Sequence, residues 1–536
     1  KLGKLNKNKQ LRNKKVVAQL CLHGDLLLLI YTYMKKTFII ASMITMLASC
    51  MGGGEKYYEK HAVIPDSATA EEIADIAARV IPTRNQLEWQ QMELTAFLHY
   101  GINTYTNREW GDGKESPELF NPTAFDADQI VKSIKAGGFK LIILTCKHHD
   151  GFCLWPSQYT EHSVKNSPYK GDIVKEISDA CKKNGIKFGV YLSPWDRNAP
   201  CYGDSPKYNE YFINQLTELL TNYGEVSEVW FDGACGEGPN GKKQVYDWDR
   251  YYSVIRKYHP DAVISICGPD VRWIGNEGGR VRKSEWSVIP LEKDSNSAVA
   301  ENSQTDESQT AIMAEKLDER SEDLGSREVL KNYESLVFKP AEADVSINLG
   351  WFWHNNLYYL FKKQRTAEDL AKIYFNTVGG NASMLLNVPP NKDGLIDKRE
   401  IKTLEKFTRL ITEPFKNEIK DKMLSVYSAE ENGREIKEDS IVLSNNEAGI
   451  AIDFPEKKQV KLISFSEDLT FSQRVEEFKI FAKKESGSYK HIYTGTVVGS
   501  KKIVRFNSPI LTDRLVIIIT QSRSNPVLKD IRVYGI

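Results

Sequence analysis

Two acidic residues stand where the chain could present carboxyl groups to a pocket. Asp232 ends the apolar run Glu228-Val-Trp-Phe-Asp232, and the following Gly-Ala turn leaves its side chain facing whatever lies beyond. Glu277 stands between Asn276 and two glycines, in a loop that could bring a carboxyl group over a cavity. Paired carboxyl groups are the equipment of glycoside hydrolysis, one as nucleophile and the other as acid and then base. The structural alternative for Asp232 is a cap of the following helix.

A third acid, Glu285, competes with Glu277 for the role of acid. It stands beside Trp286 in Lys283-Ser-Glu-Trp286, a segment that predicts a strand. We favour Glu277, because a loop residue reaches a leaving oxygen more easily than a residue deeper in a strand. An apolar lid from Trp273 or Trp286 would favour the protonated form of Glu277 that the first step requires.

Histidine and tryptophan residues accompany these acids. His148 and His149 follow an apolar run and could hold a metal, serve a structural role or bind hydroxyl groups. We favour hydroxyl binding and predict neither metal nor cofactor, because adjacent strand residues point in opposite directions and a metal site needs more ligands. Tryptophans near strand ends favour apolar platforms for a sugar ring over ordinary core, since indole offers a flat face and an N–H donor. They are Trp110, Trp230, Trp286 and Trp353.

Alternating apolar runs and amphipathic segments supply the elements that would position these residues. Short continuous apolar runs separated by helical patterns, without a Rossmann glycine motif, favour an α/β fold of the (β/α)8 barrel type over a doubly wound sheet. The predicted strands are 94–99, 140–147, 187–193, 228–232, 262–268, 283–286, 344–349 and 384–388, and the predicted helices include 127–136, 173–184, 208–223 and 248–258. In a barrel all strand ends meet at one face, so the scattered motifs become a single site.

The first 80 residues contain a pattern that is typical of exported proteins. Residues 1–33 are basic and unpatterned, and we expect no structural role for them. Residues 34–50 have the positive start, short apolar core and small-residue end of a signal peptide, and that core is too short to span a bilayer. The Leu-Ala-Ser-Cys50 end resembles a bacterial lipobox, with a plain secretory signal as the alternative. We therefore expect a lipid on Cys50, a linker over 51–80, and a periplasmic or outer-membrane lipoprotein that meets the membrane only through its lipid.

Composition excludes some partners. The chain has 536 residues and carries 72 Lys and Arg against 72 Asp and Glu, so no basic field favours nucleic acid. Six cysteines follow residue 50, and their spacing fits neither a zinc ribbon nor a dense disulfide scaffold. Cys146 and Cys267 lie in strand-like runs and are predicted to be buried.

The chain divides into two expected domains, the barrel over 81–412 and an all-β sandwich over 413–536. A charged insertion, 291–340, separates the sixth and seventh strands and would either cover the site or extend into solvent. After Pro414 the apolar period becomes two, which predicts short strands. They are 450–454, 459–465, 474–482, 491–498, 502–506, 515–520 and 528–534. Because the second domain has no dense aromatic platform, we favour a buttress over a glycan-binding module.

Residues from about 89 to 411 resemble family 29 glycoside hydrolases, the α-L-fucosidases. The matching segments are Phe97-Leu-His-Tyr-Gly101, Glu109-Trp-Gly111, Lys147-His-His-Asp-Gly-Phe152, Gly189-Val-Tyr-Leu-Ser193, Val229-Trp-Phe-Asp-Gly233, Lys339-Pro-Ala-Glu-Ala-Asp-Val-Ser-Ile347 and Leu386-Asn-Val-Pro-Pro390. The resemblance implies an α/β barrel, a galactose-binding-like β-sandwich, and release of terminal L-fucose with retained configuration by Asp232 as nucleophile. It implies fucose contacts from His99, Glu109, Trp110, His148, His149, Tyr191 and Trp230.

The segment around the second acid resembles one subgroup of that family. Asn276-Glu-Gly278, followed by Ser284-Glu-Trp-Ser-Val-Ile-Pro290, is similar to enzymes that act on α-1,3/1,4-linked fucose in branched glycans, with Glu277 as acid/base. The expected partner is a fucosylated oligosaccharide or glycoconjugate, whose methyl group would suit an apolar tryptophan wall. Two alternatives stay open, a glycan-binding lipoprotein without catalysis and a barrel glycosidase for another sugar.

Overall fold

The structure is a computed structural model, and it describes residues 61–238, 240–291, 320–355, 364–428, 436, 440–444 and 447–536. The predicted upstream segment, the signal peptide and Cys50 lie outside the described residues, as do residues 292–319 of the predicted insertion. Within the described ranges, no helix combines the length and the apolar character that crossing a bilayer would require.

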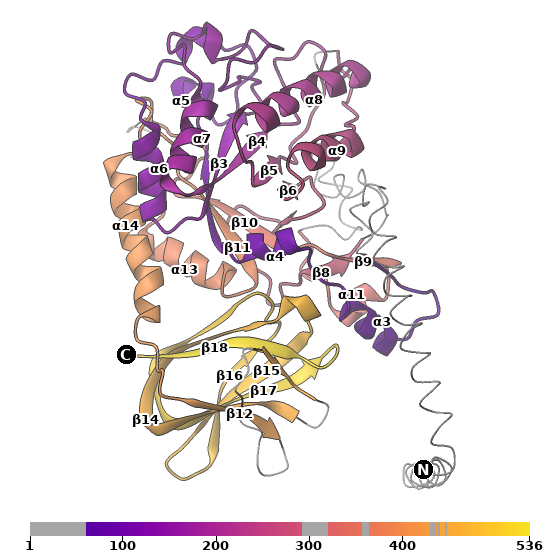
Figure 1. Ribbon diagram of the computed structural model, residues 1–536, viewed down its shortest axis with the longest axis vertical. Coiled ribbons are helices and arrows are strands. Elements are labelled where there is room, and N and C mark those ends of the chain that lie inside the picture. The colour runs from indigo at the N-terminus through magenta and orange to yellow at the C-terminus, as the bar shows by residue number, and fades with distance from the viewer. Residues whose placement is uncertain are drawn as a thin grey trace, which may run out of the picture. The chain divides into compact units, whose positions relative to one another are not determined.

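Eight parallel strands form the predicted barrel (Figure 1). Their hydrogen-bonded order is β6-β5-β4-β3-β2-β11-β10-β7. A bridge between Ser265 of β6 and Val271, the residue before β7, links the two ends of this order, so the barrel is nearly closed. The strands are β2 (Leu94–Leu98), β3 (Leu141–Lys147), β4 (Lys187–Leu192), β5 (Glu228–Phe231), β6 (Val263–Ile266), β7 (Arg272–Trp273), β10 (Ala341–Ser346) and β11 (Ala382–Asn387). Nearly all of their residues are buried, as in parallel sheets covered on both faces.

The predicted sixth strand was wrong. Residues 283–286 form no strand, and β7 takes the sixth place by pairing with Ala341 and Glu342 of β10. The 283–286 segment has only one apolar residue, and its Glu285 is drawn into an ion pair with the buried Arg272. β7 has only two residues and contains the charged Arg272, so the short segment between Pro269 and Gly275 gives a sequence pattern little continuous apolar run to detect.

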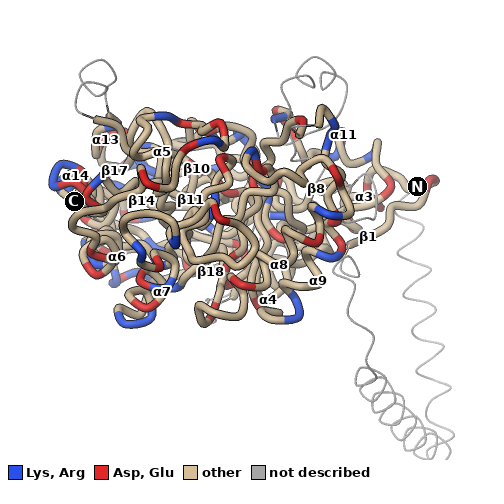
Figure 2. Tube along the Cα trace, turned by 90° about the horizontal axis from the view of Figure 1, so that it is seen from above, with Lys and Arg blue, Asp and Glu red and all other residues tan. Residues whose placement is uncertain are grey.

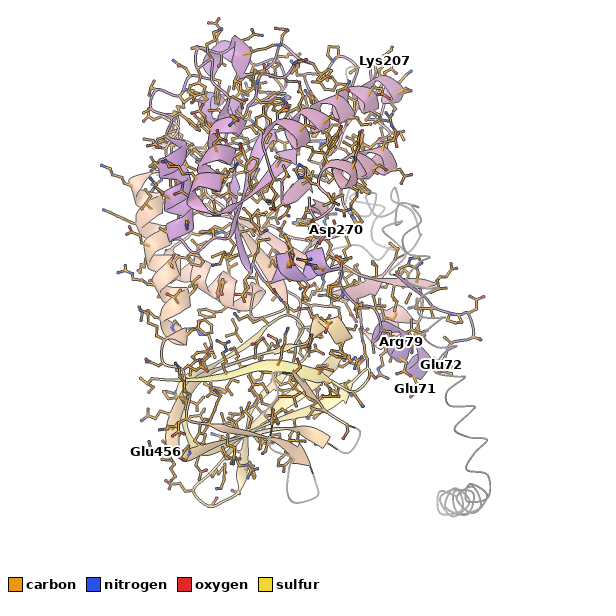
Figure 3. The ribbon with its side chains drawn as sticks, viewed as in Figure 1. Glu71, Glu72, Arg79, Lys207, Asp270 and Glu456 are labelled. Carbon is orange, nitrogen blue, oxygen red and sulfur yellow. The ribbon has the colours of Figure 1, made fainter. Side chains whose placement is uncertain are left out.

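Asp270 fixes the turn at which the barrel closes (Figure 3). Its carboxylate accepts the backbone N–H of Ile264 at 2.6 Å and the Arg256 guanidinium, also at 2.6 Å. The Asp270 carboxylate thus connects the turn before β7 both to β6 and to the helix that carries Arg256. These bonds hold the short strand β7 in register beside the other strands.

Helices cover the outside of the barrel (Figure 1). They are α5 (Ile102–Thr106), α6 (Ala127–Ala136), α7 (Ile173–Asn184), α8 (Ser205–Asn222), α9 (Trp248–Tyr258), α13 (Ala367–Thr377) and α14 (Lys398–Thr412). The predicted helices are confirmed to within a few residues at their ends. The side chains of Asp126, Asp172 and Asp247 accept a backbone N–H in the first turn of α6, α7 and α9, which is why these helices begin where they do.

A smaller sheet and three helices lie outside the barrel. The sheet has the order β1 (Ala62–Val63), β9 (Ser335–Phe338), β8 (Val288–Pro290), and the helices are α3 (Ala70–Ala77), α4 (Arg84–Gln90) and α11 (Arg327–Leu330). Part of the expected linker 51–80 is therefore folded. Thr69 caps α3 through a capping box, and Ile73 and Ala77 are buried in a core of their own with Leu330 and Leu336.

The C-terminal part is an antiparallel β domain. Its strands are β12 (Met423–Ser428), β13 (Ser440–Val442), β14 (Glu447–Glu467), β15 (Val475–Lys483), β16 (Tyr489–Gly495), β17 (Lys502–Ser522) and β18 (Val527–Gly535). The strands β14 and β17 each span two predicted short strands, because register shifts break the alternation without ending the pairing. Buried side chains from β12, β14, β15 and β18 share one core, including Val426, Ile450, Phe478 and Val533.

The β domain contacts the barrel through apolar packing, in which Leu462 and Ile503 join the main barrel core, and through polar pairs. Lys501 Nζ lies 2.7 Å from Glu93 Oε1, and the backbone N–H of Ser287 donates to Gln473 Oε1 at 2.7 Å. Lysine and arginine are interspersed with aspartate and glutamate along the chain in Figure 2, in keeping with a net charge of zero.

Candidate active site

A cavity of about 360 Å³ lies at the carboxyl ends of the barrel strands. It is lined by Phe97, His99, Trp110, His148, His149, Trp195, Trp230, Asp232, Gly233, Ala234, Cys235, Ile266, Trp273, Glu277, Arg320, Asp344 and Trp351. Flat aromatic faces and convergent polar groups in one concave site suit a sugar ring, which presents both apolar and hydroxyl-bearing surfaces. The structure thus brings together residues that are more than 250 positions apart in the chain.

Asp232 follows directly after β5 and faces this cavity. The Tyr191 hydroxyl donates to Asp232 Oδ2 at 2.9 Å, and the Ala234 N–H donates to Oδ1 at 2.8 Å. His149 Nε2 lies 3.7 Å from Oδ2. The capping alternative is wrong, since the next helix, α9, takes its cap from Asp247. Asp232 is held in one orientation while its side chain stays 24% exposed, as a group that must meet a ligand requires.

Glu277 reaches the same cavity from the loop that follows β7. Asn276 shapes the loop, because its Oδ1 accepts the backbone N–H groups of Gly278 at 3.1 Å and Arg280 at 3.0 Å. Partial burial of the carboxyl group, together with the negative charges of Asp232 and Glu109, raises the pKa of Glu277, against an opposing hydrogen bond from Trp351. A carboxyl group with a raised pKa keeps its proton to a higher pH than an ordinary glutamic acid, as a proton donor requires.

Glu285, the competing acid, lies elsewhere. Its side chain is fully buried and pairs with the equally buried Arg272, and Arg282 Nη1 lies 3.1 Å from Glu285 Oε1. It does not line the cavity. The structure therefore places Glu285 in an internal ion pair, and of the two competing acids only Glu277 lines the cavity with Asp232.

Three buried histidines form a neutral polar wall. His99 Nδ1 lies 3.0 Å from Asn387 Oδ1, His149 Nδ1 lies 2.7 Å from Ser193 Oγ, and the His148 ring stacks on Tyr191. Burial lowers the pKa of all three, that of His99 to about 4. Neutral imidazoles offer one donor and one acceptor nitrogen each, which suits hydroxyl groups.

The expectation that His148 and His149 point apart was wrong. Both follow the end of β3 at Lys147, where strand alternation no longer applies, and their ring centroids are 4.1 Å apart. One ligand atom each from His148, His149 and Asp232 lies within 4.8 Å of the others, so these three residues could also meet a cation.

Glu109 acts through the backbone of the opposite loop. Its carboxylate forms a close hydrogen bond with the His354 ring and accepts the backbone N–H of Trp351 at 2.7 Å. Burial opposes ionisation, but these two hydrogen bonds prevail and lower the pKa of Glu109. An ionised Glu109 thus fixes the loop that presents Trp351 to the cavity.

Comparison with known proteins agrees with this geometry. A family model described as Alpha-L-fucosidase matches residues 77–413. Alpha-L-fucosidase 1 of Arabidopsis thaliana is 37% identical over 472 residues, which cover 85% of this chain and 87% of that protein. The chain belongs to the α-L-fucosidase family. It is therefore a glycoside hydrolase of family 29.

Solved structures support the same assignment for this fucosidase. A Bacteroides ovatus crystal structure named for the same activity has a TM-score of 0.78 and 46% identity, covering 90% of this chain and 78% of that one. A Ruminococcus gnavus GH29 fucosidase in complex with fucose has a TM-score of 0.71 and 31% identity, covering 85% and 95% of the two chains.

The aromatic wall of the fucosidase differs in part from the predicted one. Trp110 and Trp230 line the cavity, but Trp286 and Trp353 do not. Trp286 is buried under the Arg523 guanidinium, whose carbon lies 3.7 Å from the ring centroid, and Trp353 Nε1 donates to Asp397 at 2.7 Å. Both predictions followed motif position, which cannot tell which of two nearby tryptophans faces inward.

The cavity lining also includes Trp195, Trp351 and Asp344, for which the sequence predicted no role. Trp195 follows Ser193 at the end of β4, and its ring lies 5.6 Å from that of Trp110. Trp351 precedes the expected Trp353 in the same loop. Asp344 stands on β10, where alternation with the inward-facing Glu342 could have indicated it, had the strand been predicted to begin at residue 341.

Proposed function

We propose that this fucosidase is a retaining exo-enzyme that releases terminal α-L-fucose, with Asp232 as nucleophile and Glu277 as acid and base. The observation that carries the proposal is the presence of two unlike carboxyl groups in one cavity. Asp232 accepts hydrogen bonds from the Tyr191 hydroxyl and the Ala234 N–H, which orient its carboxyl group, whereas the environment of Glu277 raises the pKa of that residue. Such a pair divides nucleophile from acid.

The reaction proceeds in two displacements. Asp232 attacks the anomeric carbon while the Glu277 proton passes to the departing glycosidic oxygen, so a fucosyl ester on Asp232 replaces the broken bond. Glu277, now ionised, takes a proton from water as that water attacks the same carbon and frees Asp232. Two inversions leave the configuration unchanged.

The cavity favours a deoxy-sugar. Trp230, Trp273 and Trp351 supply apolar faces for the methyl group of fucose, which carries no 6-hydroxyl, and the three histidines face the hydroxyl-bearing side. The R. gnavus enzyme that binds fucose supports this sugar as the ligand. The sequence around Glu277 supports α-1,3 or α-1,4 linkages as the preferred substrates.

Hydrolysis of an aryl α-L-fucoside, followed by NMR of the first-formed sugar, tests the proposal. We expect α-L-fucose as first product, cleavage of α-1,3 and α-1,4 before α-1,2 and α-1,6 linkages, and no cleavage of an aryl β-galactoside. Asp232→Ala should lose turnover, and azide should restore it with formation of the β-fucosyl azide. A β-configured first product, or full activity of Asp232→Ala, would refute the assignment of Asp232.

We also propose that the enzyme is exported and anchored by a lipid on Cys50. The lipobox-like end of residues 34–50 supports this location. Labelling with a radioactive fatty acid in a bacterial host should mark the wild-type chain and not Cys50→Ala. Equal labelling of both chains would contradict the anchor.

A further inference from the structure

We propose that Asp344 binds the substrate sugar as a neutral carboxylic acid, donating its O–H to one of the sugar's hydroxyl oxygens. The inference rests on the proposed function, because it names a third acid of the same pocket. The paired-carboxylate chemistry does not require this residue, and the family resemblance assigned it no role, although it lies in the matching segment 339–347.

Asp344 stands on the inner face of the barrel. It lies two residues after Glu342 on β10, and residues two apart on a strand share a face. Glu342 points inward, since its Oε1 accepts the Trp230 indole N–H at 2.7 Å. Asp344 is thus one layer closer to the mouth of the barrel, where it lines the cavity although it is only 4% exposed.

The two oxygens of Asp344 have different surroundings. Oδ1 accepts the Trp273 indole N–H at 2.6 Å, which fixes the plane of the carboxyl group. In the described part of the chain, no other side chain donates a hydrogen bond to the carboxyl group and no cation pairs with it, although the residue's own backbone N–H lies close enough to lower its pKa slightly. One oxygen therefore remains for a ligand in the cavity.

The charges around Asp344 favour its protonated form. Burial, followed by the negative charges of Glu277 and Asp232, raises the pKa of Asp344 to about 8, and the Trp273 hydrogen bond only partly opposes them. An ionised Asp344 would add a negative charge beside Asp232, and among the described residues it has no ion-pair partner to offset that charge, since the Arg320 guanidinium that also lines the cavity lies over the Trp273 ring. As a neutral acid, Asp344 can donate a hydrogen bond where an ionised carboxylate can only accept one.

A substrate-variant cycle tests this inference. Wild type, Asp344→Asn and Asp344→Ala are assayed on an aryl α-L-fucoside and on its 2-, 3- and 4-deoxy analogues. We expect Asp344→Ala to lower kcat/KM on the parent sugar by about 10- to 100-fold, because it leaves one sugar hydroxyl unpaired in a buried site. With wild type, the analogue that lacks the hydroxyl bound by Asp344 should have a lower kcat/KM than the parent sugar, and with Asp344→Ala this difference should disappear. The amide of Asp344→Asn also donates, so this variant should stay within about fivefold of the wild-type kcat/KM on the parent sugar and should keep the difference between the two sugars.

Glu400→Gln is the matched control. Glu400 is a buried acid whose pKa burial also raises to about 8, but it does not line the cavity, so its kcat/KM should match wild type for all four sugars. The inference is overturned if Asp344→Ala discriminates among the deoxy analogues as wild type does, or if Asp344→Asn is as impaired as Asp344→Ala while both unfold at the wild-type temperature. A wild-type enzyme inactive on the parent fucoside would instead refute the proposed function itself.

Discussion

Glu277 lines the cavity whereas Glu285 lies in a buried ion pair, so substituting the two residues should affect different properties of the enzyme. Glu277→Ala removes the acid that faces the cavity, and general acids contribute about 10²- to 10⁴-fold to rate. We expect a loss of that size on α-1,3- and α-1,4-linked oligosaccharides, whose leaving groups need a proton. On an aryl fucoside with an acidic phenol the first step should be nearly unaffected, because that leaving group departs without protonation.

Glu285→Gln should have the opposite profile. Arg272 and Glu285 are both fully buried, so neutralising Glu285 leaves a guanidinium inside the protein with its charge uncompensated. Breaking such a pair costs about 3–5 kcal/mol of unfolding free energy. Arg282, whose Nη1 lies 3.1 Å from Glu285 Oε1, would lose a partner at the same time. Activity per folded molecule should remain, since Glu285 does not line the cavity.

The two variants are compared by a leaving-group series of aryl fucosides and by urea denaturation. Glu277→Ala should show a steeper dependence on the leaving-group pKa, and azide should give the α-fucosyl azide, since azide would attack the ester already formed on Asp232. Its rate should also lose the alkaline decline that deprotonation of Glu277 imposes on wild type. Full activity of Glu277→Ala on oligosaccharides, or a steep leaving-group dependence for Glu285→Gln at unchanged stability, would reverse the two assignments.

Two further predictions follow from side-chain placement. Trp351→Ala should lower kcat/KM for an aryl fucoside by about tenfold or more, because the cavity loses an apolar face. Trp353→Ala should change mainly the unfolding midpoint, because Trp353 bonds Asp397 and does not line the cavity. Equal kinetic effects of the two substitutions would place both rings in the pocket. Glu400→Gln should be more stable than wild type at pH 8. Burial raises the pKa of Glu400 to about 8, so between about pH 4 and 8 the native state binds more protons than the unfolded state. As pH rises through this range, the unfolding free energy of wild type should fall relative to that of the variant by at most about 1.4 kcal/mol per pH unit. Denaturation curves at pH 4, 6 and 8 measure this difference. A gap that stays constant with pH would contradict the raised pKa.

Sequence patterns predicted the elements that are long and periodic. The strands β2 to β6 are continuous apolar runs, and helices such as α6 and α7 begin at aspartate caps, so apolar period and cap chemistry agree. β7 could not be predicted, because its two residues are placed by pairing with β10 and by Asp270 rather than by their own apolar character. The positions of Asp232 and Glu277 in the cavity could be anticipated because each stands beside glycine, Asp232 directly after a strand and Glu277 in a loop.

The orientation of the tryptophans was beyond sequence reasoning, and the barrel interior shows why. The indole N–H groups of Trp89, Trp230 and Trp273 donate to Glu228, Glu342 and Asp344 at 2.8, 2.7 and 2.6 Å, each time joining different strands or a strand and α4. Such partners meet only after the barrel closes, so no local spacing encodes them.

The same pairs explain how buried acids persist beneath a catalytic pocket. Burial raises the pKa of Glu228 to about 7 and that of Asp344 to about 8, and it raises the pKa of Glu342 well above its ordinary value. A protonated carboxyl group still accepts an indole hydrogen bond through its carbonyl oxygen. The interior can therefore orient Trp230 and Trp273 with little added negative charge below Asp232, which is in keeping with the proposed roles of Asp232 as nucleophile and Glu277 as proton donor.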